Sequence, residues 1–529
     1  MVFGILVVAC VILLCVLAEK FSDKFGMPAL ILFMFIGMLF GRDGISEIAF
    51  HNFKLAEDIC SIALVFIMFY GGFNTKWSAA KAVAAKSIIL STLGVAVTAG
   101  VTALLCMGIL HLPAAESFLI GAVLSSTDAA SVFAILRKKK LNLKSGTASI
   151  LEVESGSNDP IAYLLTIIAI SMIGVGESIP LGATIVKQIL FGVLMGIIQA
   201  RITLTVLTKT KLIAEGLDTI FIIAVVMLCY GLTSAVGGNA YLSVYLFGII
   251  IGNSKMQNKQ TLIPFFDGVT SLAQILIFFL IGLLAYPHQM PEVILPAFAI
   301  VVFLTLIARP VAVFLLLLPF RCSIPQCLLI SWAGLRGASS SVFAIMAVAS
   351  GIEMQHNLFH VVFMVSLFSV AIQGTMLPLV ARKLLMVDEN ADVRKTFNDY
   401  QEEVSFQLMR MHIPKGHNWV NQKIKDVHMP TGSLAIMIKR GGETIITKGD
   451  TDIQVGDDVI LSVPPYTPSE SDKLQERHIE STDAWCDKSI GELNLPKDVL
   501  IAMIIRNAET IIPDGKTVVK EGDTVVMYQ

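Results

Sequence analysis

Long apolar runs alternate with short polar segments over roughly the first three quarters of the chain. The runs lie near residues 1–18, 27–41, 57–73, 86–110, 116–136, 147–173, 180–208, 218–236, 239–252, 269–286, 291–320, 325–350 and 358–385. A helix needs about 20 apolar residues to cross a bilayer, and most of these runs approach or exceed that length. The pattern therefore predicts about thirteen transmembrane helices.

The composition agrees with a membrane domain followed by a different kind of domain. Hydrophobic residues make up 55% of the chain and charged residues 15%, with a mean hydropathy of +0.75, outside the range of soluble proteins of this size. Charged residues become dense from Asp388 onward. We expect an all-α polytopic membrane domain (1–387), a linker (388–400) and a small α+β cytoplasmic tail of two modules (401–466 and 467–529).

The positions of Lys and Arg predict the orientation in the membrane. They gather in the odd-numbered loops between runs, whereas the even-numbered loops hold only Arg42 and Lys54. Cytoplasmic loops carry such an excess, which places the N-terminus outside and the tail in the cytoplasm. The net charge of −2, with no basic patch among aromatic residues, gives no sign of nucleic-acid binding.

Two runs are interrupted by polar residues. The fifth contains Ser125-Ser126-Thr127-Asp128 and the twelfth contains a Gly- and Ser-rich stretch from Gly334 to Ser341. Broken helices at matching places in two halves indicate the substrate site of a transporter. The breaks are seven helices apart, so helices one to six would repeat, inverted, as helices eight to thirteen. The alternative is a packing seam of small residues.

The segment Leu151–Ile161 places polar residues in an otherwise apolar region. On a helix, Ser155 and Asp159 share one face, and Glu154 and Asn158 share the neighbouring face. Ionisable residues at membrane depth are costly and are functional candidates by default. The alternative is a hydrophilic loop that ends at Pro160.

The buried charges suggest an ion site. We expect Glu154 to form a structural ion pair with Arg336, which leaves Asp159 without a counter-charge, so a proton and a monovalent cation would compete for it. Ser155, Thr127 and Asp128 would supply further oxygen ligands. The other charges within runs, Lys187, Arg201 and Arg309, are expected to snorkel or to pair at interfaces.

The chain shows neither a nucleophile-base pair nor a metal motif such as H-E-x-x-H, so we expect no enzyme, and no metal beyond the transported cation. A selectivity-filter loop of the T-V-G-Y-G type is also missing, which disfavours a cation channel. A gated cation channel and a membrane sensor that binds ions without moving them stay open as alternatives.

Four motifs resemble the NhaP-like Na+(K+)/H+ exchangers of the cation/proton antiporter superfamily. The motifs are SSTDAASVFAILR (125–137), LEVESGSNDP (151–160), WAGLRGA (332–338) and FYGGF (69–73).

This resemblance implies a homodimeric antiporter with an elevator-like core. Asp159 would carry the ion and the proton with Asn158 as its partner, Thr127 and Asp128 would form the crossover, and Glu154 and Arg336 would pair. An Asn-Asp pair in place of two acids implies electroneutral exchange. Tyr70 stands where some relatives carry an acid, so the choice between K+ and Na+ stays open.

The tail repeats itself at a spacing of 66 residues. Trp419 aligns with Trp485, and Gly456-Asp457 with Gly522-Asp523. Each copy predicts a short helix after the Trp, followed by strands such as 434–438 and 459–463. The copies resemble the C-terminal RCK (TrkA-C) module of potassium transport systems, which dimerises and in some members binds cyclic di-AMP. This resemblance favours K+ as the ion. A dimerisation platform without a ligand is the alternative.

Overall fold

The computed structural model describes most of the chain. The residues that it describes are 2–25, 28–44, 50, 52–139, 141–174, 181–207, 217–254, 259–352, 354, 357–388, 407–427, 429, 433–441, 443–463, 474–479, 483, 485–493, 495, 500–506, 509–511 and 513–528. The chain forms two compact units, Met1–Asn398 and Asp399–Gln529. Apart from Asp388, the predicted linker lies outside the described residues.

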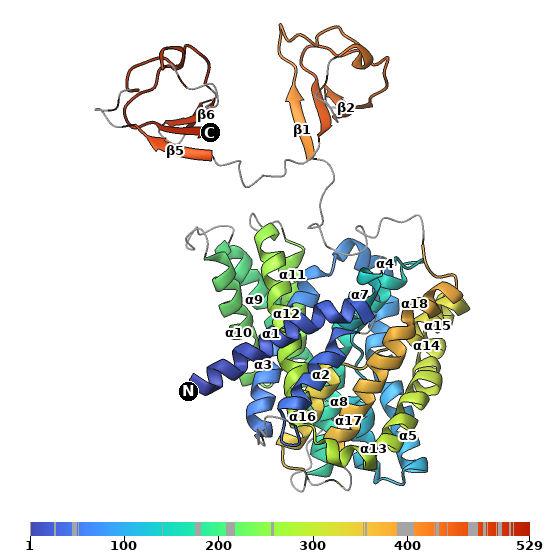
Figure 1. The fold of residues 1–529 in the computed structure, drawn as a ribbon. Helices are drawn as coiled ribbons and strands as arrows, with labels where there is room; N and C mark the ends of the chain where they lie inside the picture. The colour runs from blue at the N-terminus through green and yellow to red at the C-terminus, as the bar shows by residue number, and fades with distance from the viewer. Residues whose placement is uncertain are drawn as a thin grey trace. The chain divides into compact units, whose positions relative to one another are not determined.

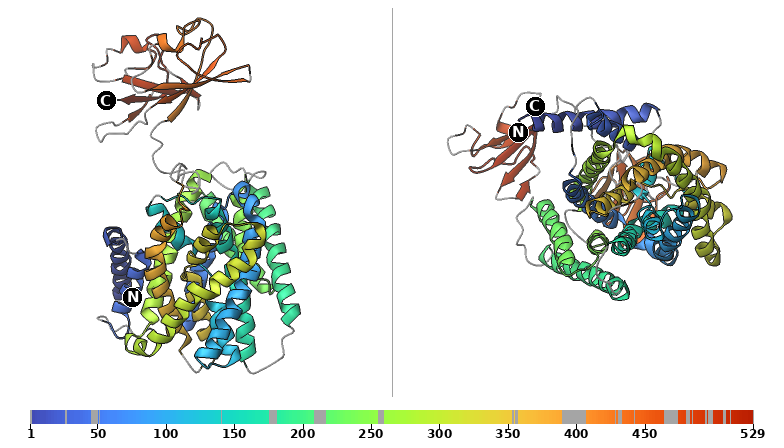
Figure 2. Two further views of the ribbon diagram at one scale, coloured as in Figure 1. Left: turned by 90° about the vertical axis from the view of Figure 1, so that its right-hand side faces the viewer. Right: turned by 90° about the horizontal axis from the view of Figure 1, so that it is seen from below.

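The first unit is a bundle of helices, most of which run in a similar direction (Figures 1 and 2). Its α-helices are α1 (Val2–Phe25), α2 (Ala29–Phe40), α3 (Phe53–Asn74), α4 (Trp77–Ile89), α5 (Val95–Ile109), α6 (Ala114–Val123), α7 (Ala129–Lys138), α8 (Thr147–Ile173), α9 (Leu181–Thr205), α10 (Asp218–Ala235), α11 (Ala240–Gly252), α12 (Lys259–Leu284), α13 (Met290–Phe303), α14 (Arg309–Leu317), α15 (Ile324–Trp332), α16 (Ala338–Ala349), α17 (Leu358–Phe368) and α18 (Thr375–Lys383).

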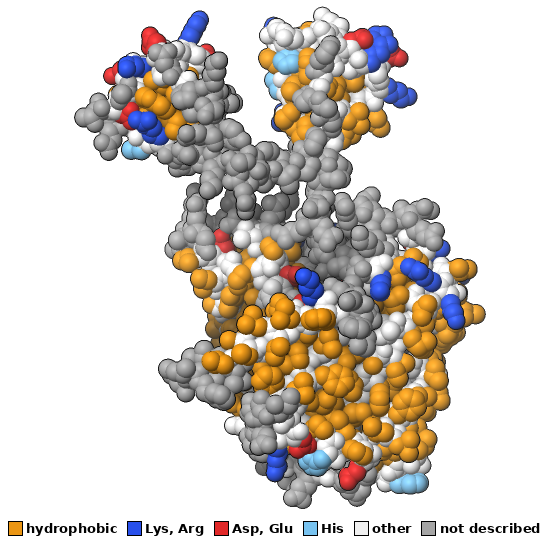
Figure 3. Space-filling model, in the orientation of Figure 1, with side chains coloured by type: hydrophobic (Ala, Val, Ile, Leu, Met, Phe, Trp, Pro, Cys, Tyr) orange, Lys and Arg blue, Asp and Glu red, His pale blue; other side chains and the backbone are white. Residues whose placement is uncertain are grey.

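Within the described residues, eight helical segments are long and apolar enough to cross a membrane, and four shorter apolar helices accompany them. Hydrophobic side chains cover most of the face of this unit shown in Figure 3. Leu104, Leu295 and Leu315, for example, are more than 60% exposed. Such a surface suits hydrocarbon rather than water. The prediction of a helical membrane domain is confirmed, whereas the count of thirteen spans stays a prediction.

Glycines allow the helices of this unit to pack closely. At Gly37 of α2 an added Cβ would meet the backbone of α12, and at Gly72 of α3 it would meet the backbone of α11. Small residues bring helices together in this way where no hydrophobic force drives their association. Gly72 belongs to the FYGGF motif, whose second glycine therefore serves helix packing.

Helix α8 runs without interruption from Thr147 to Ile173 and carries Pro160 in its interior. The alternative of a loop ending at this proline is therefore wrong. Proline lacks a backbone N–H, so the carbonyl of Gly156, four residues earlier, loses its helical donor, a loss that helices in membranes tolerate. Separately, the Asn239 side chain donates to the Pro160 carbonyl at 2.7 Å and ties α8 to the start of α11.

The two predicted helix breaks are confirmed. The fifth run forms α6 and α7, separated by residues 124–128, and the twelfth forms α15 and α16, separated by residues 333–337. Inverted repeats stay a prediction, although π-helical turns interrupt the fourth and eleventh runs at Leu90–Gly94 and Leu304–Ala308, which correspond in the proposed halves.

The tail contains two four-stranded antiparallel sheets. The first has the order β1-β4-β2-β3 and the second the order β5-β8-β6-β7, with equivalent bulges in β2 and β6. The strands are β1 (Gln407–His412), β2 (Leu434–Arg440), β3 (Glu443–Ile446), β4 (Asp458–Val463), β5 (Leu474–His478), β6 (Leu500–Arg506), β7 (Glu509–Ile511) and β8 (Thr524–Tyr528).

The sequence predicted the strands of the tail better than its helices. Both predicted strands of the first module are present as β2 and β4. The short helix expected after each Trp is, in the described residues, only a turn followed by a 3-10 helix, Ile424–Asp426 or Ile490–Glu492. Each module has its own buried core, centred on Ile438 and Val459 in the first and on Ile504 and Val525 in the second.

Candidate ion site at the helix breaks

The two helix breaks touch each other. The backbone N–H of Asp128, in the break between α6 and α7, donates to the carbonyl of Leu335, in the break between α15 and α16, at 2.8 Å. Four helix ends therefore meet in the interior of the membrane unit. Each end leaves backbone groups without helical partners and carries a partial charge.

Arg336 neutralises the end of α6. Its Nη1 donates to the carbonyls of Ser125 and Ser126 at 3.1 and 2.6 Å, and its side chain is 2% exposed. These carbonyls follow the last turn of α6, where a helix carries partial negative charge. The guanidinium thus satisfies backbone acceptors that would otherwise be buried without a donor.

Asp128 caps the start of α7. Its Oδ1 accepts from the backbone N–H of Ser131 at 3.1 Å, and its other carboxyl oxygen accepts from the Ser131 hydroxyl at 2.5 Å. A Cβ added at Gly337 would collide with this carboxyl group, so the glycine before α16 leaves room for it. These contacts favour a capping role, and the assignment of Asp128 as an ion ligand stays a prediction.

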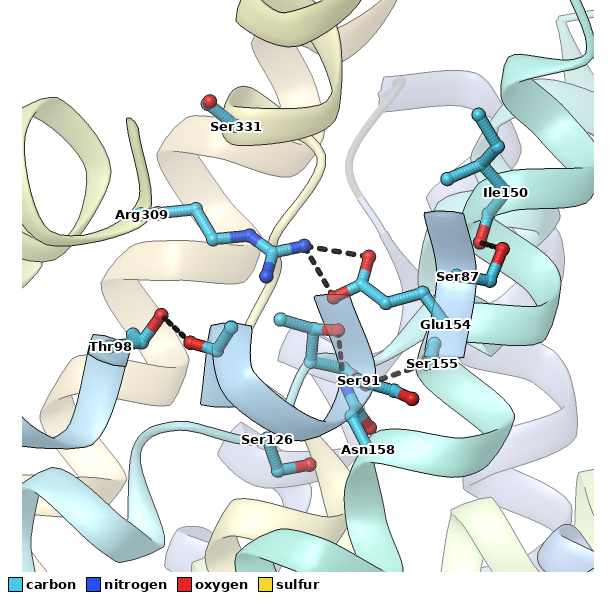
Figure 4. Close-up of polar contacts among 12 residues, drawn as sticks. Ser87, Ser91, Thr98, Ser126, Ile150, Glu154, Ser155, Asn158, Arg309 and Ser331 are labelled. Atoms are coloured by element: carbon cyan, nitrogen blue, oxygen red, sulfur yellow. Dashed lines mark hydrogen bonds and ion pairs between the residues drawn. The ribbon is translucent and has the colours of Figure 1, made fainter. Parts of the chain in front are cut away.

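The predicted ion pair of Glu154 with Arg336 is wrong in its basic partner. Arg309, at the start of α14, donates from Nη2 to both carboxyl oxygens of Glu154 at 2.6 and 2.7 Å (Figure 4). Both side chains are at most 2% exposed. Arg336 instead donates to the carbonyls at the end of α6.

Arg309 also explains a glycine in the WAGLRGA motif. A Cβ added at Gly334 would lie 3.0 Å from Arg309 Nε. The break between α15 and α16 therefore passes directly beside the guanidinium group. No strong signal in the sequence predicted this contact, because Arg309 lies inside a long apolar run where snorkelling was the simpler expectation.

Thr127 joins the break to α8 beside Asp159. Its carbonyl accepts from the Ser155 hydroxyl at 2.6 Å, and its hydroxyl accepts from Asn158 Nδ2. Asn158 Oδ1 is fully buried and has no hydrogen-bond donor among the described residues. A buried acceptor without a donor is costly and invites a cation. The structure thus brings together Ser155, Asn158 and Thr127, as predicted.

Asp159 is 4% exposed and lies beside two serines that the prediction did not include. It accepts a hydrogen bond from the Ser126 hydroxyl, which lies 2.8 Å from the hydroxyl of Ser339 in the first turn of α16. Asp159 forms no ion pair with any described residue. Ser126 lies in the first break and Ser339 in the polar stretch Gly334–Ser341, so their residue type was the available signal, but the sequence did not indicate which serine would reach Asp159.

The chain matches a known family over most of this unit. The family described as "Sodium/hydrogen exchanger, transmembrane" matches residues 7–383, which include both breaks and the whole of α8. The chain belongs to the sodium/hydrogen exchanger family. The TrkA-C domain matches residues 408–466 and 474–528 of the same chain. Both resemblances inferred from the motifs are therefore confirmed.

Relatives of this exchanger resemble it along most of their length. A K(+)/H(+) antiporter NhaP of Alkalimonas amylolytica is 34% identical over 499 residues, covering 91% of this chain and 86% of the relative. A K(+)/H(+) antiporter NhaP2 of Shewanella sp. (strain ANA-3) is 30% identical over 449 residues, covering 84% of this chain and 78% of the relative.

A solved structure shows the same fold. The sodium proton antiporter MjNhaP1 from Methanocaldococcus jannaschii, determined at pH 8, superposes with a TM-score of 0.64 at 20% identity, covering 73% of this chain and 99% of that one. At this identity the likeness concerns the fold of the exchanger and not its ion.

Proposed function

We propose that this chain is an electroneutral antiporter that exchanges K+ for H+ across a bacterial membrane. Asp159 binds either the cation or the proton, and the two exclude each other. Ser155, Asn158 and Thr127 provide the neutral oxygen ligands of the cation. No chemical bond of a substrate is made or broken, so the protein is a transporter and not an enzyme.

The observation that carries this proposal is the buried, unpaired Oδ1 of Asn158, one residue before Asp159. A monovalent cation would satisfy this oxygen and the carboxylate together. Hard cations prefer oxygen ligands of this kind. When the cation leaves, burial favours the protonated acid, so a proton takes its place.

The assignment of the other charges supports electroneutral exchange. Glu154 is paired with Arg309, and Arg336 and Asp128 serve helix ends. Asp159 is then the one carboxylate in this cluster whose charge is free to change. One bound K+ or one bound H+ leaves the site with the same net charge, so the membrane potential would not drive the exchange.

The preference for K+ rests on the relatives and the tail. Two relatives with at least 30% identity are named as K(+)/H(+) antiporters, and TrkA-C modules resemble parts of potassium transport systems. Na+/H+ exchange is the second candidate, because the family that matches residues 7–383 is described as a sodium/hydrogen exchanger. A cation channel would instead pass K+ without moving protons, and a sensor would move neither.

The setting of the protein is part of the same proposal. We place it as a homodimer in the lipid bilayer, with the N-terminus outside and the tail in the cytoplasm. The tail regulates exchange, with cyclic di-AMP as the candidate nucleotide; a tail that only dimerises is the alternative. The test of the transport proposal is cation-driven proton movement in proteoliposomes, compared between the wild type and Asp159→Asn.

A further inference from the structure

Two serine hydroxyls, one from each broken helix, lie beside Asp159. Ser126 belongs to the break between α6 and α7, and Ser339 to the first turn of α16. Ser126 donates to Asp159 Oδ1, and the two hydroxyl oxygens are 2.8 Å apart. Both serines are at most 4% exposed, so little or no water competes for these contacts.

Ser155 and Asn158, the neutral ligands predicted for the cation, form their hydrogen bonds with Thr127 and not with Asp159. Ser155 donates to the Thr127 carbonyl, and Asn158 donates to the Thr127 hydroxyl. Neither of these hydrogen bonds reaches Asp159. The Asp159 carboxyl group instead accepts its hydrogen bond from Ser126.

We propose that Ser126 and Ser339 form a hydroxyl pair that positions Asp159 between cation-binding events and sets the pH and cation concentration at which exchange runs. This inference rests on the proposed antiport function. According to this inference, the broken helices do more than cross each other through their backbones. Their hydroxyl groups also act on the carboxyl group of Asp159.

Hydroxyl groups suit this task because each one both donates and accepts hydrogen bonds. The pair can donate to Asp159 when it is a carboxylate and accept from it when it is protonated, after a rotation of the hydroxyl groups alone. A lysine or arginine at the same place would favour only the carboxylate and would compete with the cation. A pair of hydroxyls leaves the net charge of the site unchanged.

The surroundings of Ser126 hold it in place. Its carbonyl accepts from Arg336 Nη1 at 2.6 Å, and Arg336 is fixed in turn by a hydrogen bond from its own backbone N–H to Ser369 at 3.0 Å. A side chain held by packing and by a second layer of hydrogen bonds keeps a defined geometry. The backbone of Ser126 is therefore held by Arg336, and its hydroxyl group contacts Asp159 from a defined position.

The test compares Ser126→Ala, Ser339→Ala and Ser126→Thr with the wild type in proteoliposomes, by measuring K+-driven proton movement over a grid of pH and K+ concentration. Removal of a hydrogen-bond donor destabilises the charged form of Asp159 relative to the protonated form, so protons compete better with K+. We expect Ser126→Ala to raise the half-maximal K+ concentration about tenfold at neutral pH and to move the pH profile about one unit towards alkaline values.

The other variants separate positioning from packing. Ser126→Thr keeps the hydroxyl and should keep the wild-type pH profile. Ser339→Ala removes only the second hydroxyl and should shift the profile in the same direction by less, and it decides the question if Ser126→Ala does not fold. Ser331→Ala is the control, because this buried serine donates to the Cys327 carbonyl of its own helix, at 2.8 Å, and to no other group among the described residues.

The outcomes distinguish this inference from the proposed function. Wild-type protein that moves no protons with any cation overturns both. Wild-type exchange together with unshifted profiles in Ser126→Ala and Ser339→Ala overturns the hydroxyl pair alone. A shift in both alanine variants, with wild-type profiles in Ser126→Thr and Ser331→Ala, supports it.

Discussion

Arg309 and Glu154 are 155 positions apart in the sequence, and one guanidinium nitrogen contacts both oxygens of the carboxylate, at 2.6 and 2.7 Å. This pair joins the start of α14 to α8 at Glu154, five residues before Asp159. It removes Glu154 from the set of carboxylates that could carry an ion. Asp159 therefore differs from Glu154, because the charge of Glu154 is already neutralised by an arginine.

Loss of one partner of this pair should destabilise the protein strongly. In Arg309→Met the Glu154 carboxylate is left buried without its cation, at a cost of about 3–5 kcal/mol. Thermal unfolding in detergent measures the effect. The double variant Arg309→Met/Glu154→Leu, which leaves no buried charge, should recover most of the loss. Equal stability of the single and double variants would contradict the pairing.

Gly337→Ala should disturb the crossing of the helix breaks. The new Cβ collides with the Asp128 carboxyl group, which cannot move without losing its bonds to Ser131. We expect a loss of about 1–3 kcal/mol in the free energy of unfolding, together with reduced transport. Gly100→Ala is the matched control. Gly100 lies in α5 with no atom within 4 Å of an added Cβ, so alanine should leave stability unchanged or raise it by about 0.5–1 kcal/mol.

The buried aspartates of the tail should make its stability depend on pH. Two hydrogen bonds from Arg440, at 2.8 and 2.7 Å, lower the pKa of Asp457, and Arg506 lowers the pKa of Asp523 in the same way. A lowered folded-state pKa adds stability above the unfolded value, about 3.9, and this stability is lost as the pH falls through the folded value.

Hydrogen exchange of β2 and β6 peptides in the full-length protein can measure this effect. Between pH 7 and pH 5 the contribution should be constant, and it should fall below about pH 4. Asp457→Asn should lower the stability of the first module by about 1.5–3 kcal/mol at pH 7 and flatten its pH dependence. The second module, with Asp523 intact, is the internal control. An unchanged first module would refute the role of Asp457.

A short pairing joins the end of the membrane unit to the loop before α8. The backbone N–H of Lys144 donates to the Met386 carbonyl and that of Asp388 to the Asn142 carbonyl, each at 2.9 Å. A chain ending at Asp388 should therefore keep its thermal stability and its exchange but lose any response to cyclic di-AMP. A chain ending at Lys383 also loses this pairing and should unfold at a lower temperature. If the chain ending at Asp388 retains the response, the tail is not the regulator.

The sequence predicted the parts of the site that follow from local pattern. The polar breaks and the polar face of α8 each leave a signal within a few neighbouring residues, the module repeat leaves one at a fixed spacing of 66 residues, and the structure contains all three. Asp159 was recognisable as an ionisable residue in an apolar helix. The identity of the family followed from the same motifs.

The pairing of side chains across the bundle was not predictable in the same way. The sequence offered two buried arginines, Arg309 and Arg336, as partners of Glu154. Only the packing of α14 against the second break determines that Arg309 forms the pair. The contact of Ser126 with Asp159 likewise depends on how two breaks cross. The extent of α12 was also underestimated, because the predicted apolar run began at 269, whereas the helix begins at Lys259.

The measurement that tests the central claim most directly is the dissipation of a pH gradient in proteoliposomes on addition of K+, Na+ or Li+, with and without an imposed membrane potential. The account predicts that K+ drives proton movement in the wild type to the same extent at either potential, and that Asp159→Asn abolishes it. Exchange retained by Asp159→Asn, or proton movement that follows the membrane potential, would contradict an electroneutral carrier centred on Asp159.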